Sequence, residues 1–163
     1  MEFEIPNEPE NVLKNFKLAI ETKNVQEYMN CFTPEPHRYK FEPEQYFFEE
    51  FQANGWSLDH ERDFFNQLTK SVVTLNFSFT ESGEPALNPI YLPAAEDSVE
   101  SNFSNYLMTV NYSIDSSQVF SGLTRFKLYH AQDKDAWYIH YWQDKADNQD
   151  YTLTATALKT QYY

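Results

Sequence analysis

The apolar residues of this chain change their spacing about halfway along it. Over 12–32 they recur every three or four positions, which is the period of an amphipathic helix. Over 73–80 and again over 106–114 they alternate with polar residues, which is the period of a half-buried strand. Helices first and strands second is typical of an α+β domain, in which helices cover one face of an antiparallel sheet.

Local signals set the expected bounds of the helices. Pro9 suits the first turn of one helix because a missing N–H costs nothing there. Asn24 can cap a second helix, and the residues 33–36 end it. Ser57 is a good cap for a third helix, which we expect to run to about Leu68.

The remaining segments predict a sheet. A short strand is expected at 38–41, and 42–51 is assigned to loop or a single helical turn. Four longer strands follow, at 73–80, 106–114, 120–129 and 136–143, with a long loop over 81–101. The predicted fold is therefore one α+β domain over 1–163. Its curved antiparallel sheet packs on the N-terminal helices as a cone, with a mouth ringed by Trp56, the loop and the C-terminal tail.

Composition excludes several classes of protein. The net charge of −13 argues against nucleic-acid binding, which needs surplus Lys and Arg. With 14 Phe and 12 Tyr the chain has enough apolar material for a core. Three glycines cannot form a phosphate-binding loop, so no cofactor is expected, and a single cysteine, Cys31, excludes an internal disulfide. No zinc or calcium motif is present, and no apolar run is long enough for a membrane span.

Glu61 is the candidate catalytic residue. It falls within the apolar stripe of the third helix, together with Leu58, Phe65 and Leu68. Burial disfavours a charged carboxylate and raises its pKa, which is how a general acid or base near neutral pH arises. The alternative is a buried ion pair, for which Arg38 on the nearby short strand is a possible partner.

Aromatic residues and methionine dominate the positions expected to face the interior of the cone. Because each buried tyrosine hydroxyl needs a partner, we expect a partly open pocket for a small apolar or aromatic ligand. The predicted pocket residues are Tyr28, Phe32, Tyr39, Trp56, Phe77, Tyr106, Met108, Tyr112, Phe126, Trp137 and Tyr141.

The last strand is aromatic on both faces, so periodicity alone does not orient it. We assign Trp137, Ile139 and Tyr141 to the interior. Tyr138, His140 and Trp142 then form an outer aromatic face, and a patch of this kind is typical of a dimer interface. With the opposite orientation, His140 would enter the pocket as an acid or base.

Several segments resemble the nuclear transport factor 2-like superfamily. They are Pro9-Glu10-Asn11-Val12-Leu13, Gly55-Trp56 through Glu61, and Ala-Trp-Tyr-Ile-His-Tyr-Trp-Gln-Asp at 136–144. The closing Leu158-Lys159-Thr160-Gln161-Tyr162 is similar to the tail of uncharacterised bacterial members, many of them exported lipoproteins. The resemblance implies the cone fold and homodimers. It also favours a location outside the cytoplasm, reached after loss of a leader, over a cytoplasmic one.

The resemblance does not fix an activity, because the superfamily includes isomerases, dehydratases and members without chemistry. Our leading hypothesis is a non-catalytic module that binds a small ligand or a partner and forms a homodimer. The alternative is an isomerase or dehydratase that uses Glu61, with a tyrosine such as Tyr112, on a small apolar substrate. A third possibility is a purely structural interaction protein with a filled core.

Overall fold

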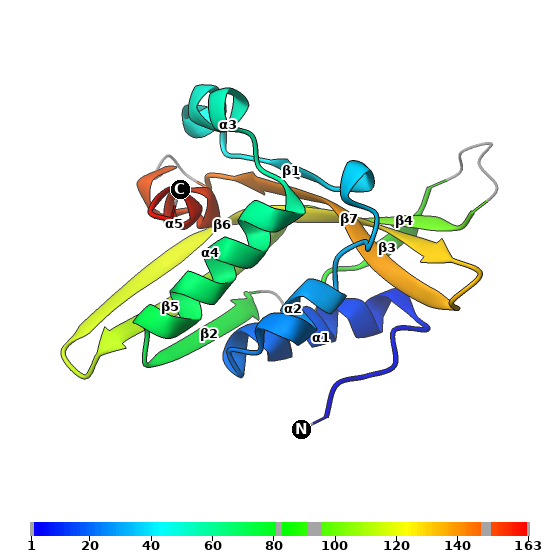
Figure 1. Cartoon of the computed structure of the whole chain (residues 1–163), viewed down its shortest axis with the longest axis horizontal. Coiled ribbons are helices and arrows are strands. Elements are labelled where there is room, and N and C mark those ends of the chain that lie inside the picture. The colour runs from blue at the N-terminus through cyan, green and yellow to red at the C-terminus, as the bar shows by residue number, and fades with distance from the viewer. Residues whose placement is uncertain (1, 81–82, 91–95, 148–150, 163) are drawn as a thin grey trace.

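The computed structural model describes residues 2–80, 83–90, 96–147 and 151–162. Helices α1 (Pro9–Glu21), α2 (Val25–Asn30) and α4 (Leu58–Ser71) lie on one side of a curved, open sheet (Figure 1). The side chain of Asn24 accepts a hydrogen bond from the backbone of Glu27, and Ser57 accepts one from His60. These caps and the helices they begin were predicted from the sequence, and the structure confirms them.

Two further helices lie at one end of the molecule. Helix α3 (Phe48–Asn54) occupies a segment that the sequence left between loop and helix. Gly55, with φ of 72°, ends it in a conformation that favours glycine. Helix α5 (Ala155–Thr160) follows the last strand and was not foreseen (Figure 1).

Among the described residues the sheet contains seven strands: β1 (Lys40–Glu42), β2 (Thr74–Phe79), β3 (Leu87–Pro89), β4 (Ser98–Ser101), β5 (Ser104–Ser113), β6 (Ser116–Ala131) and β7 (Ala136–Lys145). The long strand β6 pairs with β7 along one edge and with β5 and then β4 along the other. Strand β2 extends the sheet beyond β5, and β3 extends it beyond β4.

The expected antiparallel pairing is confirmed for β2, β5, β6 and β7, while two details of the sheet differ from the prediction. Strand β1 pairs with β7 in the parallel sense, so the sheet is mixed. A parallel neighbour needs a long connection, and here almost 100 residues separate the two strands. The expected loop over 81–101 contains β3 and β4, while 81–82 and 91–95 lie outside the described residues.

A β-bulge sets the orientation of the last strand. Lys127 pairs with Tyr141 but the next residue, Leu128, pairs with Ile139, so His140 is the extra residue. The insertion shifts the alternation by one position, and Ile139 and Trp142 both face the core. The interior assignment is therefore correct for Ile139. It is wrong for Tyr141, which faces outward, and Trp142 is in the core rather than on the outer face.

The core fills the space between the helices and the concave face of the sheet. The ring of Phe16 on α1 contacts those of Phe77, Phe126 and Trp142 edge-on, with centroids 5.4–5.5 Å apart. The ring of Tyr28 on α2 stacks on Phe65 of α4 at 3.9 Å. This cluster joins helices α1, α2 and α4 to the sheet, and it encloses the buried polar groups described next.

Candidate functional site: a buried ion pair inside the cone

Glu61 lies in the first turn of α4 and is fully buried. The phenol of Tyr28 donates a 2.6 Å hydrogen bond to its Oε1, and that of Tyr39 donates a 2.9 Å bond to its Oε2. The indole Nε1 of Trp56 donates to Oε2 at 2.6 Å. Burial of this carboxylate follows from its place in the apolar stripe, as the sequence predicted.

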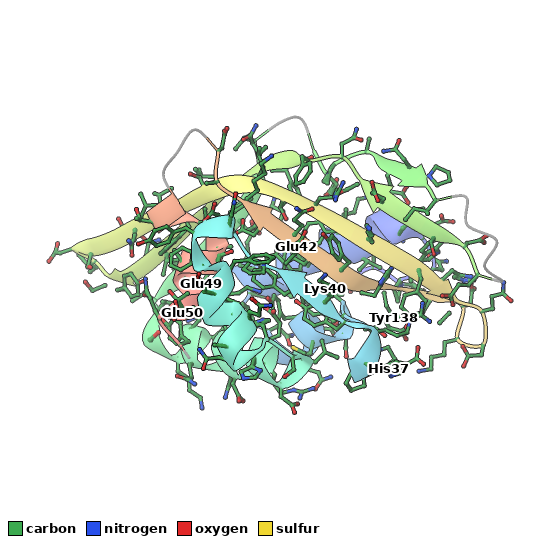
Figure 2. The ribbon with its side chains drawn as sticks, turned by 90° about the horizontal axis from the view of Figure 1, so that it is seen from above. His37, Lys40, Glu42, Glu49, Glu50 and Tyr138 are labelled. Atoms are coloured by element: carbon green, nitrogen blue, oxygen red, sulfur yellow. The ribbon has the colours of Figure 1, made fainter. Side chains whose placement is uncertain are left out.

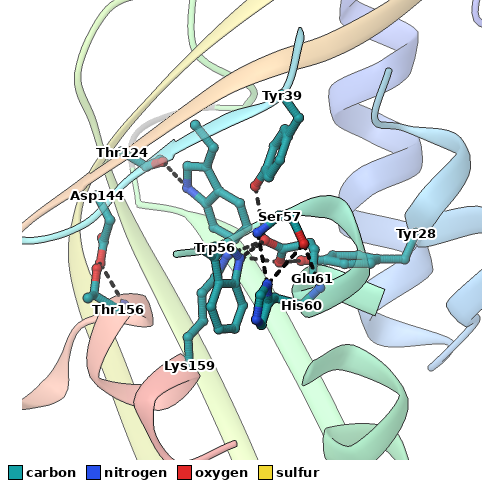
Figure 3. A network of polar contacts seen from close by, with 11 residues as sticks. Tyr28, Tyr39, Trp56, Ser57, His60, Glu61, Thr124, Asp144, Thr156 and Lys159 are labelled. Carbon is teal, nitrogen blue, oxygen red and sulfur yellow. Dashed lines mark hydrogen bonds and ion pairs between the residues drawn. The ribbon is translucent and has the colours of Figure 1, made fainter. Parts of the chain in front are cut away.

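Lys159 completes the site from the other end of the chain. Its ammonium lies 2.8 Å from Oε1 and 2.7 Å from Oε2 of Glu61, and both side chains are fully buried (Figure 3). Sequence reasoning missed this residue. The two partners lie 98 positions apart, and the tail that carries Lys159 offered a family resemblance but no periodic signal.

Arg38, the partner suggested from the sequence, is elsewhere. The turn at Pro36–Arg38 directs its guanidinium over the ring of Tyr129, 3.6 Å from the centroid. There it forms ion pairs with Glu96 and Glu35. The short strand begins two residues later than predicted, at Lys40, so Arg38 never enters the sheet.

Aromatic rings surround the ammonium of Lys159. Its Nζ lies 3.6 Å from the ring centroid of Trp142 and 3.9 Å from that of Phe41. The rings of Trp56 and Phe64 are farther away, at 5.2 and 5.6 Å. A cation within about 6 Å of an aromatic face is attracted by the ring quadrupole. We call these four rings together with Glu61 the ammonium cage.

Burial and charge shift the pKa values of the groups in this site. Burial lowers the pKa of Lys159 to about 8, while the adjacent carboxylate of Glu61 acts in the opposite direction. Burial and the charge of Glu61 raise the pKa of Tyr28 and of Tyr39 well above their usual value. Both phenols therefore remain protonated and serve as hydrogen-bond donors.

A second buried carboxylate holds the opposite end of α5. Asp144 of β7 accepts hydrogen bonds from the phenol of Tyr106 at 2.6 Å, and from the backbone N–H and the hydroxyl of Thr156 at 2.7 and 2.5 Å. Burial raises the pKa of Asp144. Gly122 makes this approach possible, since a Cβ there would come within 3.0 Å of the Tyr106 hydroxyl. Helix α5 is thus fixed at both ends.

Side chains of the described residues leave little free space beside the ion pair. A cavity of about 10 Å³ lies between α4, α5 and the sheet, with Phe65, Met108 and Leu158 among its walls. That volume is at the lower limit for a single water molecule. An aromatic cluster is therefore present as predicted, but side chains of the chain itself fill it.

The predicted pocket residues divide into three groups. Seven lie in the buried core: Tyr28, Phe32, Tyr39, Phe77, Tyr106, Met108 and Phe126. Trp56, Tyr112 and Trp137 are partly buried and pack against that core. Tyr141 lies on the outer face, where its hydroxyl donates to Glu42 and the ammonium of Lys127 sits 4.6 Å from its ring. The hydroxyls of Tyr28, Tyr39, Tyr106 and Tyr141 have hydrogen-bond partners within the protein.

The predicted dimer face is only partly on the surface. Trp142 belongs to the ammonium cage, and its indole donates to Thr124 at 2.9 Å. Tyr138 and His140 are half-buried beside the ring of Tyr129, with centroids 6.0 and 5.5 Å from it. Burial, together with the charges of Arg38 and Lys127, lowers the pKa of His140 to about 4.

Other candidate groups hold no assembled site within the described residues. The thiol of Cys31 is buried between the backbone carbonyls of Val12 and Glu27, and burial raises its pKa. No three His, Cys, Asp or Glu side chains in the described ranges gather as a set of metal ligands. No helix in those ranges is both long enough and apolar enough to cross a bilayer.

Comparison with known proteins identifies the fold. No family model and no curated protein matches this chain. Solved structures do match, among them a nuclear transport factor 2-like superfamily protein from Salmonella enterica, with a TM-score of 0.58 and 11% identity over 87% of this chain and 90% of that one. A protein from Novosphingobium aromaticivorans, provisionally assigned as a scytalone dehydratase, matches with a TM-score of 0.59 and 8% identity, over 85% of this chain and 81% of that one.

A third similar structure comes from Xanthomonas campestris and is provisionally assigned as a calcium/calmodulin-dependent protein kinase II association domain. Its TM-score is 0.58 at 12% identity, over 91% of this chain and 99% of that one. Identities this low show the fold alone. The chain therefore has the nuclear transport factor 2-like fold, with helices at the N-terminus and a curved, open, mixed sheet.

Proposed function

We propose that this protein is a non-catalytic binding module that acts through its outer surface and associates as a homodimer. The observation that carries the proposal is that the carboxylate of Glu61 already accepts hydrogen bonds from the protein at both of its oxygens. Its two oxygens accept hydrogen bonds from Tyr28, Tyr39, Trp56 and Lys159 in a fully buried site. A carboxylate held in this way has no free position for a substrate proton.

The filled interior argues against a small ligand bound inside the cone. A pocket for a drug-sized ligand usually encloses about 300–1,000 Å³. The cavity beside the ion pair encloses about 10 Å³. Binding inside the cone would require side chains of the core to leave, whereas binding on the surface would not.

The outer face of β5 and β6 is the candidate surface. Phe103, Leu107 and Val119 are exposed there, at 37%, 40% and 43%, and Leu123 is half-buried in the same row. The guanidinium of Arg125 lies 4.7 Å from the centroid of the Phe103 ring. We call these five residues the outer patch. Aromatic residues and arginine, here Phe103 and Arg125, are enriched at the centres of interfaces.

The patch adjoins a charged part of the same sheet. Figure 2 views the molecule from the side of β1, β6 and β7, with Lys40 and Glu42 labelled. Nearby, Glu100 forms ion pairs with Arg125 and Lys127. A face that carries both signs of charge around apolar residues can be complementary to a second copy of itself, as a two-fold interface requires.

The alternative, an isomerase or dehydratase based on Glu61, has less support. It requires an open cavity next to a carboxylate that has no cation within hydrogen-bond reach. Instead, Lys159 lies 2.7 Å away. Tyr112, the tyrosine suggested as a helper, is not among the residues that bond to Glu61 in the described structure.

Sedimentation velocity at micromolar concentration tests the proposal. We expect a dimer for the unmodified chain and a monomer for the double variant Leu107→Lys/Val119→Lys, because each lysine would place an unpaired charge in the interface. Val73→Lys, at an apolar residue that is 57% exposed between α4 and β2, is the matched control and should remain dimeric. A monomeric unmodified chain, or a double variant that stays dimeric, would contradict the proposal.

A further inference from the structure

We propose that the ammonium cage is a recognition site for a primary alkylammonium group, and that Lys159 is its intramolecular occupant. This inference concerns the interior of the cone. It is independent of the surface association proposed above, and its test does not depend on the oligomeric state.

The first argument is the chemistry of the walls. The Nζ of Lys159 lies closest to the rings of Trp142 and Phe41, at 3.6 and 3.9 Å, and the carboxylate of Glu61 receives it at 2.7 and 2.8 Å. Aromatic faces combined with one anion are what proteins use to bind ammonium ligands, because ring quadrupoles replace part of the lost hydration.

The second argument is that the site is complete without α5. Glu61 and Phe64 come from α4, Phe41 from β1 and Trp142 from β7, while Trp56 precedes α4. Only the cation comes from α5. A receptor whose walls belong to several packed elements keeps its shape when the occupant changes, which lowers the cost of binding.

The third argument is the independent support of the anion. Tyr28, Tyr39 and Trp56 all donate hydrogen bonds to Glu61 from elements other than α5. Trp142 is held separately by its bond to Thr124. The carboxylate and the nearest ring therefore remain oriented toward the position of the ammonium when the lysine side chain is absent.

The geometry selects an ammonium group with at least two N–H donors, as a primary alkylammonium has. Two short contacts run from Nζ to the two oxygens of Glu61, and each requires an N–H donor. A quaternary ammonium has no N–H and is wider, so it cannot make these bonds. A neutral alcohol of similar size can fill the space but carries no charge to balance the buried carboxylate.

Lys159→Ala creates the vacancy that tests the proposal, since it removes three methylene groups and the ammonium. n-Propylammonium has the same shape and is the probe. We expect n-propylammonium chloride, at several times its Kd, to raise the Tm of the variant by about 2–4 °C above an equal concentration of sodium chloride. 1-Propanol at the same concentration should leave the Tm unchanged.

Two controls define the site. The unmodified chain should not respond, because its tethered lysine occupies the cage at a high effective concentration. The double variant Glu61→Gln/Lys159→Ala should lose the response, because no buried charge remains to attract the cation.

The test also works when Lys159→Ala does not fold by itself. In that case we expect n-propylammonium, but not 1-propanol, to restore the circular dichroism of the folded chain. An equal effect of the amine and the alcohol, or no effect of the amine in either experiment, would overturn the proposal.

Discussion

Two ion pairs in this protein have similar chemistry and opposite surroundings. Lys159 and Glu61 meet inside the cone with no exposed surface, whereas Arg38 and Glu96 meet nearer the surface, with 27% and 33% of their side chains exposed. Water remains available to the outer pair when it separates. For the inner pair, the protein itself must supply every compensating contact.

The comparison shows why the inner pair needs so many neighbours. An isolated buried charge is strongly disfavoured, and attraction between two ions offsets that only with additional hydrogen bonds. Around Glu61 these come from Tyr28, Tyr39 and Trp56. Among the described residues, the outer pair has a ring contact between Arg38 and Tyr129 and a second carboxylate, Glu35.

The largest difference between the pairs should appear when one inner partner is neutralised. Lys159→Met keeps the volume of the side chain but leaves Glu61 buried and unpaired. We expect the free energy of unfolding to fall by about 3–5 kcal/mol, measured by urea denaturation.

A double variant sharpens this measurement. Glu61→Gln/Lys159→Met removes both charges and should be more stable than Lys159→Met alone, because no uncompensated ion remains. Arg62→Met on the exposed side of α4 is the control, and we expect almost no change there, since the side chain is 55% exposed. A cost below about 1 kcal/mol for Lys159→Met would mean that the inner pair is equivalent to a surface pair.

An intermediate effect is expected from acid. His140 has a folded pKa of about 4 against 6.5 when unfolded, because of burial and the charges of Arg38 and Lys127, with Glu96 opposing them. Between pH 6.5 and 4 the unfolded chain therefore binds a proton that the folded chain does not, so stability falls as the pH is lowered through this range. Allowing for partial exposure, we expect about 1–2 kcal/mol.

The comparison of His140→Gln with the unmodified chain isolates this contribution. Acid also titrates carboxylates, but these are common to both proteins. The variant should lose less stability than the unmodified chain between pH 6.5 and 4, measured as the Tm by calorimetry. If plots of Tm against pH were parallel for the two proteins, His140 would have the same pKa in the folded and unfolded states.

The smallest effect is expected at the outer pair. Glu96→Gln removes its charge but keeps its shape, and Arg38 can turn to water or to Glu35. The free energy of unfolding should fall by less than about 1 kcal/mol, as for other exposed ion pairs. If Glu96→Gln lowered the free energy of unfolding as much as Lys159→Met, the two ion pairs would contribute equally to stability and the comparison would be wrong.

Local patterns predicted the helices well because their signals lie within a few residues. The cap at Ser57 and the stripe that follows it place Glu61 in the core, and the structure confirms both. The choice of Arg38 as its partner was wrong. It rested on proximity along an expected strand, and that strand begins only at Lys40.

The last strand shows the limit of periodicity. Because aromatic residues occupy both faces of β7, periodicity did not show which face is buried. A single extra residue at His140 then placed Trp142 in the core and Tyr141 on the outer face. A bulge depends on pairing with β6, so the sequence of β7 alone does not reveal it. Helix α5 was missed for a related reason: its six residues are stabilised by Asp144 and Glu61, which lie outside the helix.

Helices α1, α2 and α4, strands β2, β5, β6 and β7, the acidic character and the burial of Glu61 were thus determined by the sequence alone, because each depends on spacing or composition over short distances. Tertiary structure decided which cation meets that carboxylate, which aromatic rings surround it and whether the cone is open or filled. These outcomes depend on contacts between segments as far apart in the sequence as Phe41 and Lys159, and only packing brings such segments together.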